Sequence, residues 1–176
     1  MNVAHVFAVA LCALATSASA QTSSRSSATS SRSAEVQPRI AGAWRLLRTE
    51  QRLADGTTRP DPDLGAKPVG YMMYDPSGRM CTVFNNTERP RWSSATPDET
   101  ELRAMYDNMV TYCARYRVDQ ARGYVVFDLE FGQSPGAAGT TRERRFELVG
   151  DHLKLYPTPL PAGVVAWTIE LERVRP

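Results

Sequence analysis

Histidine and cysteine, on which many metal and redox sites depend, are scarce in this sequence. Its 176 residues include two histidines and three cysteines, and no two cysteines form a Cys-x-x-Cys pair. We therefore expect no metal site, no dithiol redox site and no catalytic site that needs two histidines. A glycine-rich phosphate-binding loop ending in Gly-Lys-Ser/Thr is also missing, and no cofactor is expected.

The sequence also lacks an excess of one charge. Lysine and arginine total 21, aspartate and glutamate total 19, and the formal net charge is +2. The arginines alternate with acidic residues instead of forming the basic stripe that is typical of nucleic-acid-binding domains. We expect no nucleic-acid partner.

The N-terminal residues carry the one marked apolar run. Residues 6–15 are uncharged, and Ala18-Ser19-Ala20 provides the small residues of a cleavage site before Gln21. The run is too short to span a hydrocarbon core about 30 Å thick, so it predicts a signal peptide over residues 1–20, cleaved after Ala20. The mature chain is expected to be periplasmic or secreted, without a transmembrane segment.

Export bears on the two cysteines that the mature chain retains, Cys81 and Cys113. In an oxidising compartment they can form a disulfide. The alternative is two separate, partly buried thiols, which we favour on the sequence alone.

Composition divides the rest of the chain into two parts. Residues 21–38 are rich in serine and lack large apolar side chains. Such a segment cannot offset the entropy of ordering, so we expect a disordered linker. Residues 39–176 form the expected folded domain, which is long enough to enclose a core.

Alternating apolar and polar residues predict strands through most of this domain. The turn Asp75-Pro76-Ser77-Gly78 joins two of them into a hairpin. With a four-residue loop, three pairs face each other and share one side of the hairpin. These pairs are Met73 with Met80, Tyr71 with Thr82, and Val69 with Phe84.

One helix is predicted between the strands. Thr96 is a suitable N-cap, Pro97 suits the first helical position, and Glu99 completes a capping box. An apolar stripe then recurs at three- and four-residue steps, which indicates a helix of about four turns packed on the strands. The stripe consists of Leu102, Met105, Met109, Val110 and Cys113.

The alternating segments amount to about eight antiparallel strands, most of them joined by short turns. Eight such strands close into an up-and-down barrel, which leaves no strand edge exposed. The period and the strand count are also compatible with a sandwich. A barrel of this size is either filled by its own side chains or holds one small ligand.

Several short blocks in the domain resemble those of a known family. Gly42-Ala43-Trp44 resembles the Gly-x-Trp signature of lipocalins, and Arg173 resembles the arginine that covers the tryptophan ring at the closed end of such barrels. A closer resemblance is to the bacterial and fungal lipocalin-like domain family. The blocks that carry it, in order, are residues 44–46, 70–75, 78–80, 89–92, 112–116 and 145–148.

This resemblance implies an all-β, eight-stranded antiparallel up-and-down lipocalin-like barrel with one α-helix packed on it. Trp44 and Arg173 would then be structural residues. Many members carry a histidine-containing stretch in the strand after the helix, where this chain has residues 127–130 with no histidine. Chemistry that uses that histidine is not expected here.

The alternation also predicts which side chains face the interior. If Trp44 points inward, Arg48 and Glu50 do too, and Arg144 is expected to join them. Because a buried unpaired charge is costly, these residues either line a wet mouth or pair with one another. An inward arginine can also hold a ligand carboxylate. The expected ligand-binding residues are Arg48, Glu50, Tyr71, Met73, Met80, Phe84, Phe127, Arg144 and Trp167.

A mostly apolar wall with a few polar groups suits a small apolar or amphipathic ligand. Our first expectation is therefore an exported barrel that binds a small, largely apolar molecule. One alternative is an isomerase or cyclase that uses the same cavity, with Glu50 or Tyr71 as acid or base. The other is a filled barrel that acts as an interaction module through the polar loop at residues 85–92.

Overall fold

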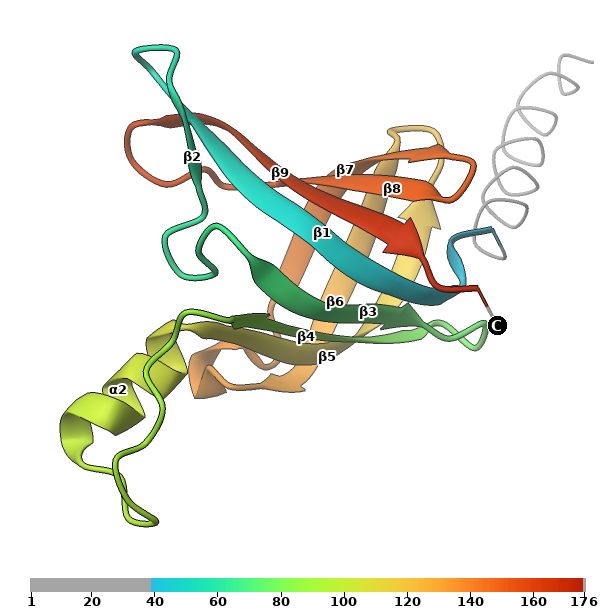
Figure 1. The fold of residues 1–176 in the computed structure, drawn as a ribbon. Helices are drawn as coiled ribbons and strands as arrows, with labels where there is room; N and C mark the ends of the chain where they lie inside the picture. The colour runs from blue at the N-terminus through green and yellow to red at the C-terminus, as the bar shows by residue number, and fades with distance from the viewer. Residues whose placement is uncertain (1–38, 176) are drawn as a thin grey trace, which may run out of the picture.

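A computed structural model describes residues 39–175 of the chain. The predicted signal peptide and linker lie outside this range. In the described residues, nine strands form one antiparallel sheet in the order β2-β1-β3-β4-β5-β6-β7-β8-β9, and β1 also pairs with β9 (Figure 1). That pairing closes the eight long strands into a barrel. The predicted all-β, eight-stranded antiparallel barrel is confirmed.

The sequence order of the elements is simple, and each long strand pairs with the next. The strands are β1 (Gly42–Leu53), β2 (Thr58–Pro60), β3 (Pro68–Tyr74), β4 (Arg79–Asn86), β5 (Met109–Asp119), β6 (Tyr124–Gly132), β7 (Thr141–Val149), β8 (His152–Pro157) and β9 (Val164–Arg173). Helix α2 (Glu99–Asp107) and the 3₁₀ turn η1 (Pro135–Ala137) lie between strands. Within residues 39–175, no helix is both long and apolar enough to cross a membrane.

The closed end of the barrel lies where β1 begins and β9 ends, next to the C-terminus in Figure 1. Trp44 is fully buried there, and its indole N–H donates to the Ile40 carbonyl at 2.8 Å. The Arg173 guanidinium lies 4.2 Å from the centre of the indole ring and donates to the carbonyl oxygens of Ala41, at 2.8 Å, and Arg39. The predicted contact between Trp44 and Arg173 is present, and it joins the start and the end of the domain.

A β-bulge changes the alternation of β1. The register of β1 against β9 shifts between Leu46 and Arg48. One extra residue on a strand sends every following side chain to the opposite face. Beyond the bulge Thr49 and Gln51 are therefore buried, and Glu50 lies on the outer face with Arg48.

The hairpin of β3 and β4 has a shorter loop than predicted. The main-chain N–H of Asp75 donates to the Arg79 carbonyl at 2.7 Å, and Gly78 adopts φ +89°. A three-residue turn that ends in a left-handed glycine is a common hairpin connection. It pairs Tyr74 with Met80, so the register differs by one residue from the predicted one.

Helix α2 begins later and ends earlier than predicted. Asp98 is the N-cap, because its side chain accepts the N–H of Glu101 while the Glu101 side chain accepts that of Asp98. The helix ends at Asn108, whose side-chain amide donates to the Ala104 carbonyl at 2.8 Å. The second half of the predicted stripe therefore belongs to β5, which starts at Met109. The helix projects beyond the open end of the barrel, and none of its residues is buried (Figure 1).

Cys81 and Cys113 form a disulfide between β4 and β5. The two residues are directly opposite each other in the register, with their Cα atoms 4.1 Å apart. The preference for two separate thiols is therefore wrong, because the pairing of the two strands brings together residues 32 positions apart.

Candidate functional site

A cavity of about 110 Å³ lies inside the barrel, toward the end that carries β2 and α2. Strands from all sides of the barrel contribute to its wall. The apolar lining residues are Leu64, Phe84, Val110, Trp167 and Ile169, and the polar ones are Thr49, Asp61, Asp63, Thr82, Tyr112, Arg142 and Arg144. A second hollow of about 160 Å³ shares Val110, Tyr112 and Arg142 with it and is bounded by β6 and η1.

The loop between β2 and β3, residues 61–67, covers part of this cavity, and we call it the lid loop. Leu64 inserts its side chain and is only 4% exposed. The main-chain N–H of Asp61 donates to the Thr49 carbonyl at 3.1 Å, and that of Gly65 donates to the Asp61 carbonyl at 2.8 Å. These bonds hold the loop against β1.

Arg144 is the buried cation of the cavity. It lies on the inner face of β7 and is 7% exposed. Its guanidinium carbon is 5.7 Å from the centre of the Phe127 ring and 6.0 Å from that of Tyr112. Among residues 39–175, no carboxylate lies within ion-pair distance of Arg144 and no group accepts a hydrogen bond from it. A desolvated charge of this kind is costly unless something pairs with it.

Three buried hydroxyl groups of the barrel interior also lack a partner, and two of them, on Thr82 and Tyr112, belong to residues that line the cavity. The side-chain oxygens of Tyr74, Thr82 and Tyr112 have no hydrogen-bond partner among the described residues. Leaving a buried polar group unsatisfied costs about 1–3 kcal/mol. Burial raises the pKa of the Tyr74 phenol well above its ordinary value, and nearby Tyr112 raises it further while Arg144 lowers it. The Tyr74 hydroxyl is therefore a protonated donor.

The carboxylates of Asp61 and Asp63 also line the cavity. Asp61 is 3% exposed, and its Oδ1 accepts the main-chain N–H groups of Asp63 at 3.0 Å and Leu64 at 3.3 Å. Burial raises the pKa of Asp61, and the two N–H groups oppose that shift only in part. Asp61 thus serves to shape the lid loop.

Five of the predicted ligand-binding residues lie inside the barrel. Phe84, Arg144 and Trp167 line the cavity, and Met80 and Phe127 pack in the core beneath it. The Trp167 indole N–H donates to the Thr49 hydroxyl at 3.0 Å. Whether these residues bind a ligand stays a prediction.

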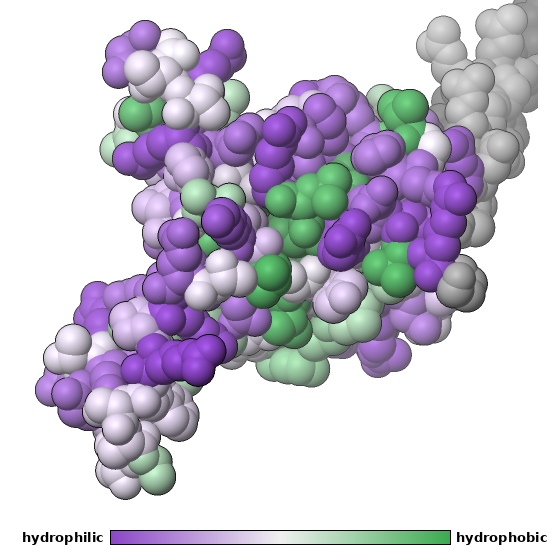
Figure 2. Space-filling model, viewed as in Figure 1, coloured by the Kyte–Doolittle hydropathy of each residue, from purple (hydrophilic) through white to green (hydrophobic). Residues whose placement is uncertain are grey.

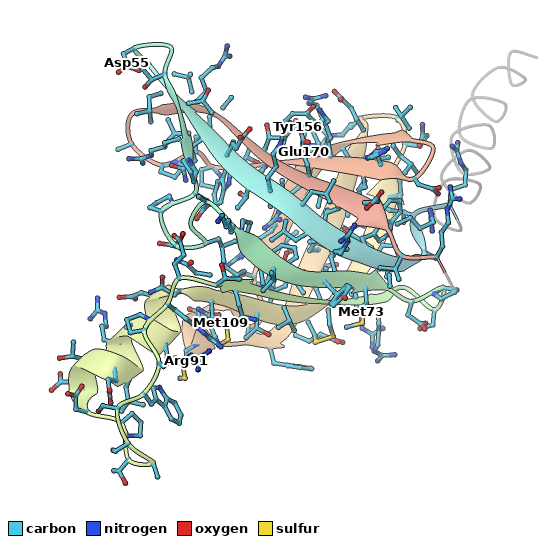
Figure 3. The ribbon with its side chains drawn as sticks, viewed as in Figure 1. Asp55, Met73, Arg91, Met109, Tyr156 and Glu170 are labelled. Carbon is cyan, nitrogen blue, oxygen red and sulfur yellow. A yellow bond between two sulfur atoms is a disulfide. The ribbon has the colours of Figure 1, made fainter. Side chains whose placement is uncertain are left out.

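The other four lie on the outer surface, and their predicted inward orientation is wrong. The β1 bulge turns Arg48 and Glu50 outward, where their side chains are 3.7 Å apart and Arg48 also lies 3.0 Å from Glu170. The shifted hairpin register turns Tyr71 and Met73 outward, 49% and 47% exposed (Met73 and Glu170 are labelled in Figure 3).

Because Glu50, Tyr71 and Met73 face outward, none of them can act in the cavity. The enzyme hypothesis loses Glu50 and Tyr71 as its acid or base, because neither side chain reaches the cavity. Met73 is instead one of several exposed apolar side chains on β1 and β3, with Leu47 and Val69, and Figure 2 shows apolar patches between hydrophilic side chains on this face of the barrel.

Four residues that line the cavity are not indicated as site residues by the sequence patterns: Thr49, Asp61, Thr82 and Tyr112. Thr49 comes inward only because of the bulge, and Tyr112 was expected at the end of a long helix. Asn108 could have indicated that the helix ends before Tyr112, because asparagine often follows the last residue of a helix. For Asp61, the signal was its place in the short Asp-Pro-Asp turn.

Gly132-Gln133-Ser134-Pro135-Gly136 has the letters of the Gly-x-Ser-x-Gly hydrolase motif. That motif works at a sharp turn from a parallel strand into a helix. Here Ser134 follows β6, which is antiparallel to both neighbours. We therefore assign Ser134 no nucleophilic role. In the part of the chain that the structure describes, no group of three or more His, Cys, Asp or Glu side chains is placed to hold a metal ion.

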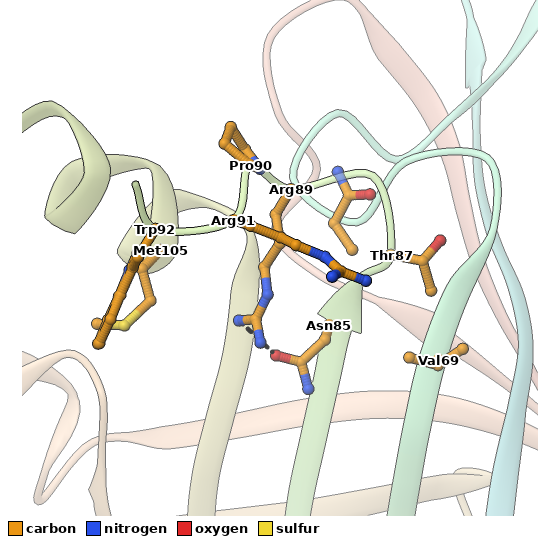
Figure 4. A pocket seen from close by; sticks show the side chains of 9 residues that line it. Val69, Asn85, Thr87, Arg89, Pro90, Arg91, Trp92 and Met105 are labelled. Carbon is orange, nitrogen blue, oxygen red and sulfur yellow. Dashed lines mark hydrogen bonds between the residues drawn. The ribbon is translucent and has the colours of Figure 1, made fainter. Parts of the chain in front are cut away.

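An open groove of about 570 Å³ lies outside the barrel, along the predicted interaction loop. Figure 4 shows Trp92 against Met105 at one end, Val69 at the other, and two arginines between them. One of these, Arg89, donates to the Asn85 side chain at 3.0 Å. The groove is separate from the cavity, with which it shares no lining residue.

A family model for a lipocalin-like domain matches residues 41–164. The chain belongs to this lipocalin-like family. The match runs from the start of the barrel to the first residue of β9 and so includes Trp44, the lid loop and Arg144. No curated protein sequence matches the chain significantly. The predicted family is confirmed, and the function of this lipocalin-like protein has to be argued from its cavity.

Proposed function

We propose that this lipocalin-like protein is exported and that its barrel binds one small, largely apolar molecule with a polar group. The observation that carries this proposal is the cavity itself, which apolar and polar side chains line together and where two of the hydroxyls have no partner among the described residues. Binding sites for small molecules have this composition. Buried polar groups usually have a hydrogen-bond partner, so the buried hydroxyls without one among the described residues support a bound molecule that supplies it.

The size of the cavity limits the ligand. Small-molecule pockets usually enclose about 300–1,000 Å³, and an apolar cavity of about 150 Å³ is known to hold benzene. The cavity of about 110 Å³ therefore takes only the end of a molecule. The rest of the ligand would occupy the adjoining hollow of about 160 Å³.

Two features support export. Residues 1–20 have the pattern of a signal peptide. The Cys81–Cys113 disulfide fits an oxidising compartment, because disulfides persist in the periplasm and outside the cell and are rare in the cytosol.

Native mass spectrometry of the protein purified from its own host tests the proposal. The mature chain should begin at Gln21 and carry a non-covalent small molecule. Thr82→Met fills the cavity and should remove that added mass, whereas Val83→Met, one residue along β4 on the outer face, should keep it. A wild-type protein without any added mass, or Thr82→Met with the same added mass, contradicts the proposal.

A further inference from the structure

Arginines near Arg144 in the sheet have carboxylate partners, and Arg144 has none among the described residues. Its neighbour Arg145 faces outward and lies 2.6 Å from Glu147, and Arg122 lies 2.6 Å from Glu143. Arg144 points into the cavity instead, where no described carboxylate pairs with it. A guanidinium stays charged and carries five N–H donors. This buried site is therefore incomplete without an acceptor that carries negative charge.

Two residues with hydroxyl groups line the same cavity. Thr82 on β4 and Tyr112 on β5 are directly opposite each other in the register. Their hydroxyl oxygens are buried and have no partner among the described residues, and the Arg144 guanidinium carbon lies 6.0 Å from the centre of the Tyr112 ring. A cation and two residues with hydroxyl donors thus belong to the wall of one cavity, which favours an oxygen anion as its occupant.

The other charged residues of the cavity favour a monoanion over a dianion. Arg142 and Arg144 are opposed by Asp61 and Asp63, which line the same cavity. These two carboxylates would repel a dianion such as phosphate more strongly than a monoanion. A carboxylate has a single charge and two coplanar oxygens that match the guanidinium fork.

We propose that the cavity recognises the carboxylate of a small monocarboxylic acid, an inference that rests on the proposed binding function. Arg144 binds the two carboxylate oxygens, and Thr82 and Tyr112 donate hydrogen bonds to them. The hydrocarbon part lies along Phe84 and Val110 and continues into the adjoining hollow.

Isothermal titration calorimetry of the mature, disulfide-bonded protein tests this ligand class. Three probes are compared near neutral pH: hexanoate, its neutral and nearly isosteric amide hexanamide, and inorganic phosphate. We expect hexanoate to bind at least about tenfold more tightly than hexanamide, since a buried charge-assisted pair is lost with the amide, and phosphate to give no binding heat.

Two neighbouring variants locate the effect. Arg144→Gln should weaken hexanoate at least about tenfold and bring it level with hexanamide, whereas Arg145→Gln, on the outer face of the same strand, should bind hexanoate like the wild type. If Arg144→Gln does not fold, Tyr112→Phe removes only the hydroxyl and should weaken hexanoate more than hexanamide, because a hydrogen bond to a charged acceptor is the stronger one.

Each other outcome counts against at least one of the two proposals. Equal binding of hexanoate and hexanamide, unchanged by Arg144→Gln, overturns the carboxylate assignment and leaves binding in the cavity intact. Preference for phosphate also overturns the carboxylate assignment. Absence of binding for all three probes, in a protein that also carries no molecule from its host, overturns both proposals.

Discussion

At the scale of single residues, the two ends of the barrel interior differ in whether their polar side chains have hydrogen-bond or ionic partners. Around Trp44, every polar contact is completed by Arg173 and by main-chain carbonyls. Around Arg144, a charge and neighbouring hydroxyls lack partners among the described residues. Because unpaired buried groups cost stability, substitutions at the two ends should have opposite effects on the free energy of unfolding.

Arg144→Met should leave that free energy unchanged or increase it. Replacing a buried ion pair by apolar side chains of similar size is often neutral, or stabilising by about 1–4 kcal/mol, and Arg144 has no ionic partner among the described residues to lose. Urea unfolding of Arg144→Met and of the outward-facing control Arg145→Met measures the effect. A loss of stability in Arg144→Met that exceeds the loss in the control would show that Arg144 is held by structural contacts.

Asp61 provides a dependence on pH. Because burial raises its pKa, the folded protein holds this proton more tightly than the unfolded chain does. The resulting stabilisation is complete below the ordinary value of 3.8 and is lost as the pH rises through the raised pKa. At neutral pH the ionised, buried carboxylate therefore lowers stability.

Asp61→Asn keeps an oxygen that can accept the two main-chain N–H groups, and it removes the charge. The variant should be more stable than the wild type near neutral pH, and the difference should shrink as the pH falls toward 3.8. Urea unfolding across this pH range measures it. Asp55→Asn is the control, because the Thr57 hydroxyl lowers the pKa of Asp55 at an exposed turn (Figure 3) and gives no such gain. A difference that is constant with pH would contradict the explanation.

At the scale of elements, sequence patterns predicted the strands well and the faces of the strands only in part. Alternation correctly placed Phe127 inside, because β6 has regular pairing around that residue. It failed for Arg48 and Glu50, which follow a bulge. A bulge arises from pairing with a strand far along the chain, so no local pattern indicates it.

Pairing between strands that are distant in the sequence also limits how much of the site could be predicted. Arg144 was found because β7 keeps its alternation from Arg144 to Leu148. The pairing of Thr82 with Tyr112 depends on the register between β4 and β5. The chain between β4 and β5 runs through α2, whose early end differs from the prediction and places Tyr112 in β5.

The disulfide joins β4 to β5 on the outer face and closes a long loop. For a separation of 32 residues, the loss of chain entropy in the unfolded state corresponds to about 2–4 kcal/mol. The Cys81→Ser/Cys113→Ser variant should lose about this much free energy of unfolding, and hexanoate affinity should not change because neither residue lines the cavity. The wild type with and without dithiothreitol is the control. Equal stability of the oxidised and reduced forms would contradict a stabilising role.

The lid loop should control the rate of binding. Leu64→Ala removes a side chain that inserts into the cavity, so hexanoate should dissociate about tenfold faster, which corresponds to about 1.4 kcal/mol. Stopped-flow fluorescence of Trp167 measures the rate, and Lys67→Ala, at an exposed position of the same loop, is the control. Unchanged rates in Leu64→Ala would show that the ligand enters and leaves elsewhere, for example through the hollow beside η1.

At the scale of the whole molecule, the two ends of the barrel differ in construction. One end is closed by the contact between Trp44 and Arg173, and the other carries the cavity, the lid loop and α2 (Figure 1). The three tryptophans report on separate places: Trp44 on the closed end, Trp92 on the outer groove and Trp167 on the cavity. Their indole N–H groups can therefore distinguish where a ligand binds.

A ¹H–¹⁵N NMR titration of the mature protein with hexanoate tests the central claim most directly. We predict saturable shifts of the Trp167 indole N–H and of the Arg144 side-chain Nε–H, with the indole signals of Trp44 and Trp92 unchanged. Shifts confined to Trp92 and the outer groove, or no saturable shift at Trp167 and Arg144, would contradict carboxylate binding in the barrel cavity.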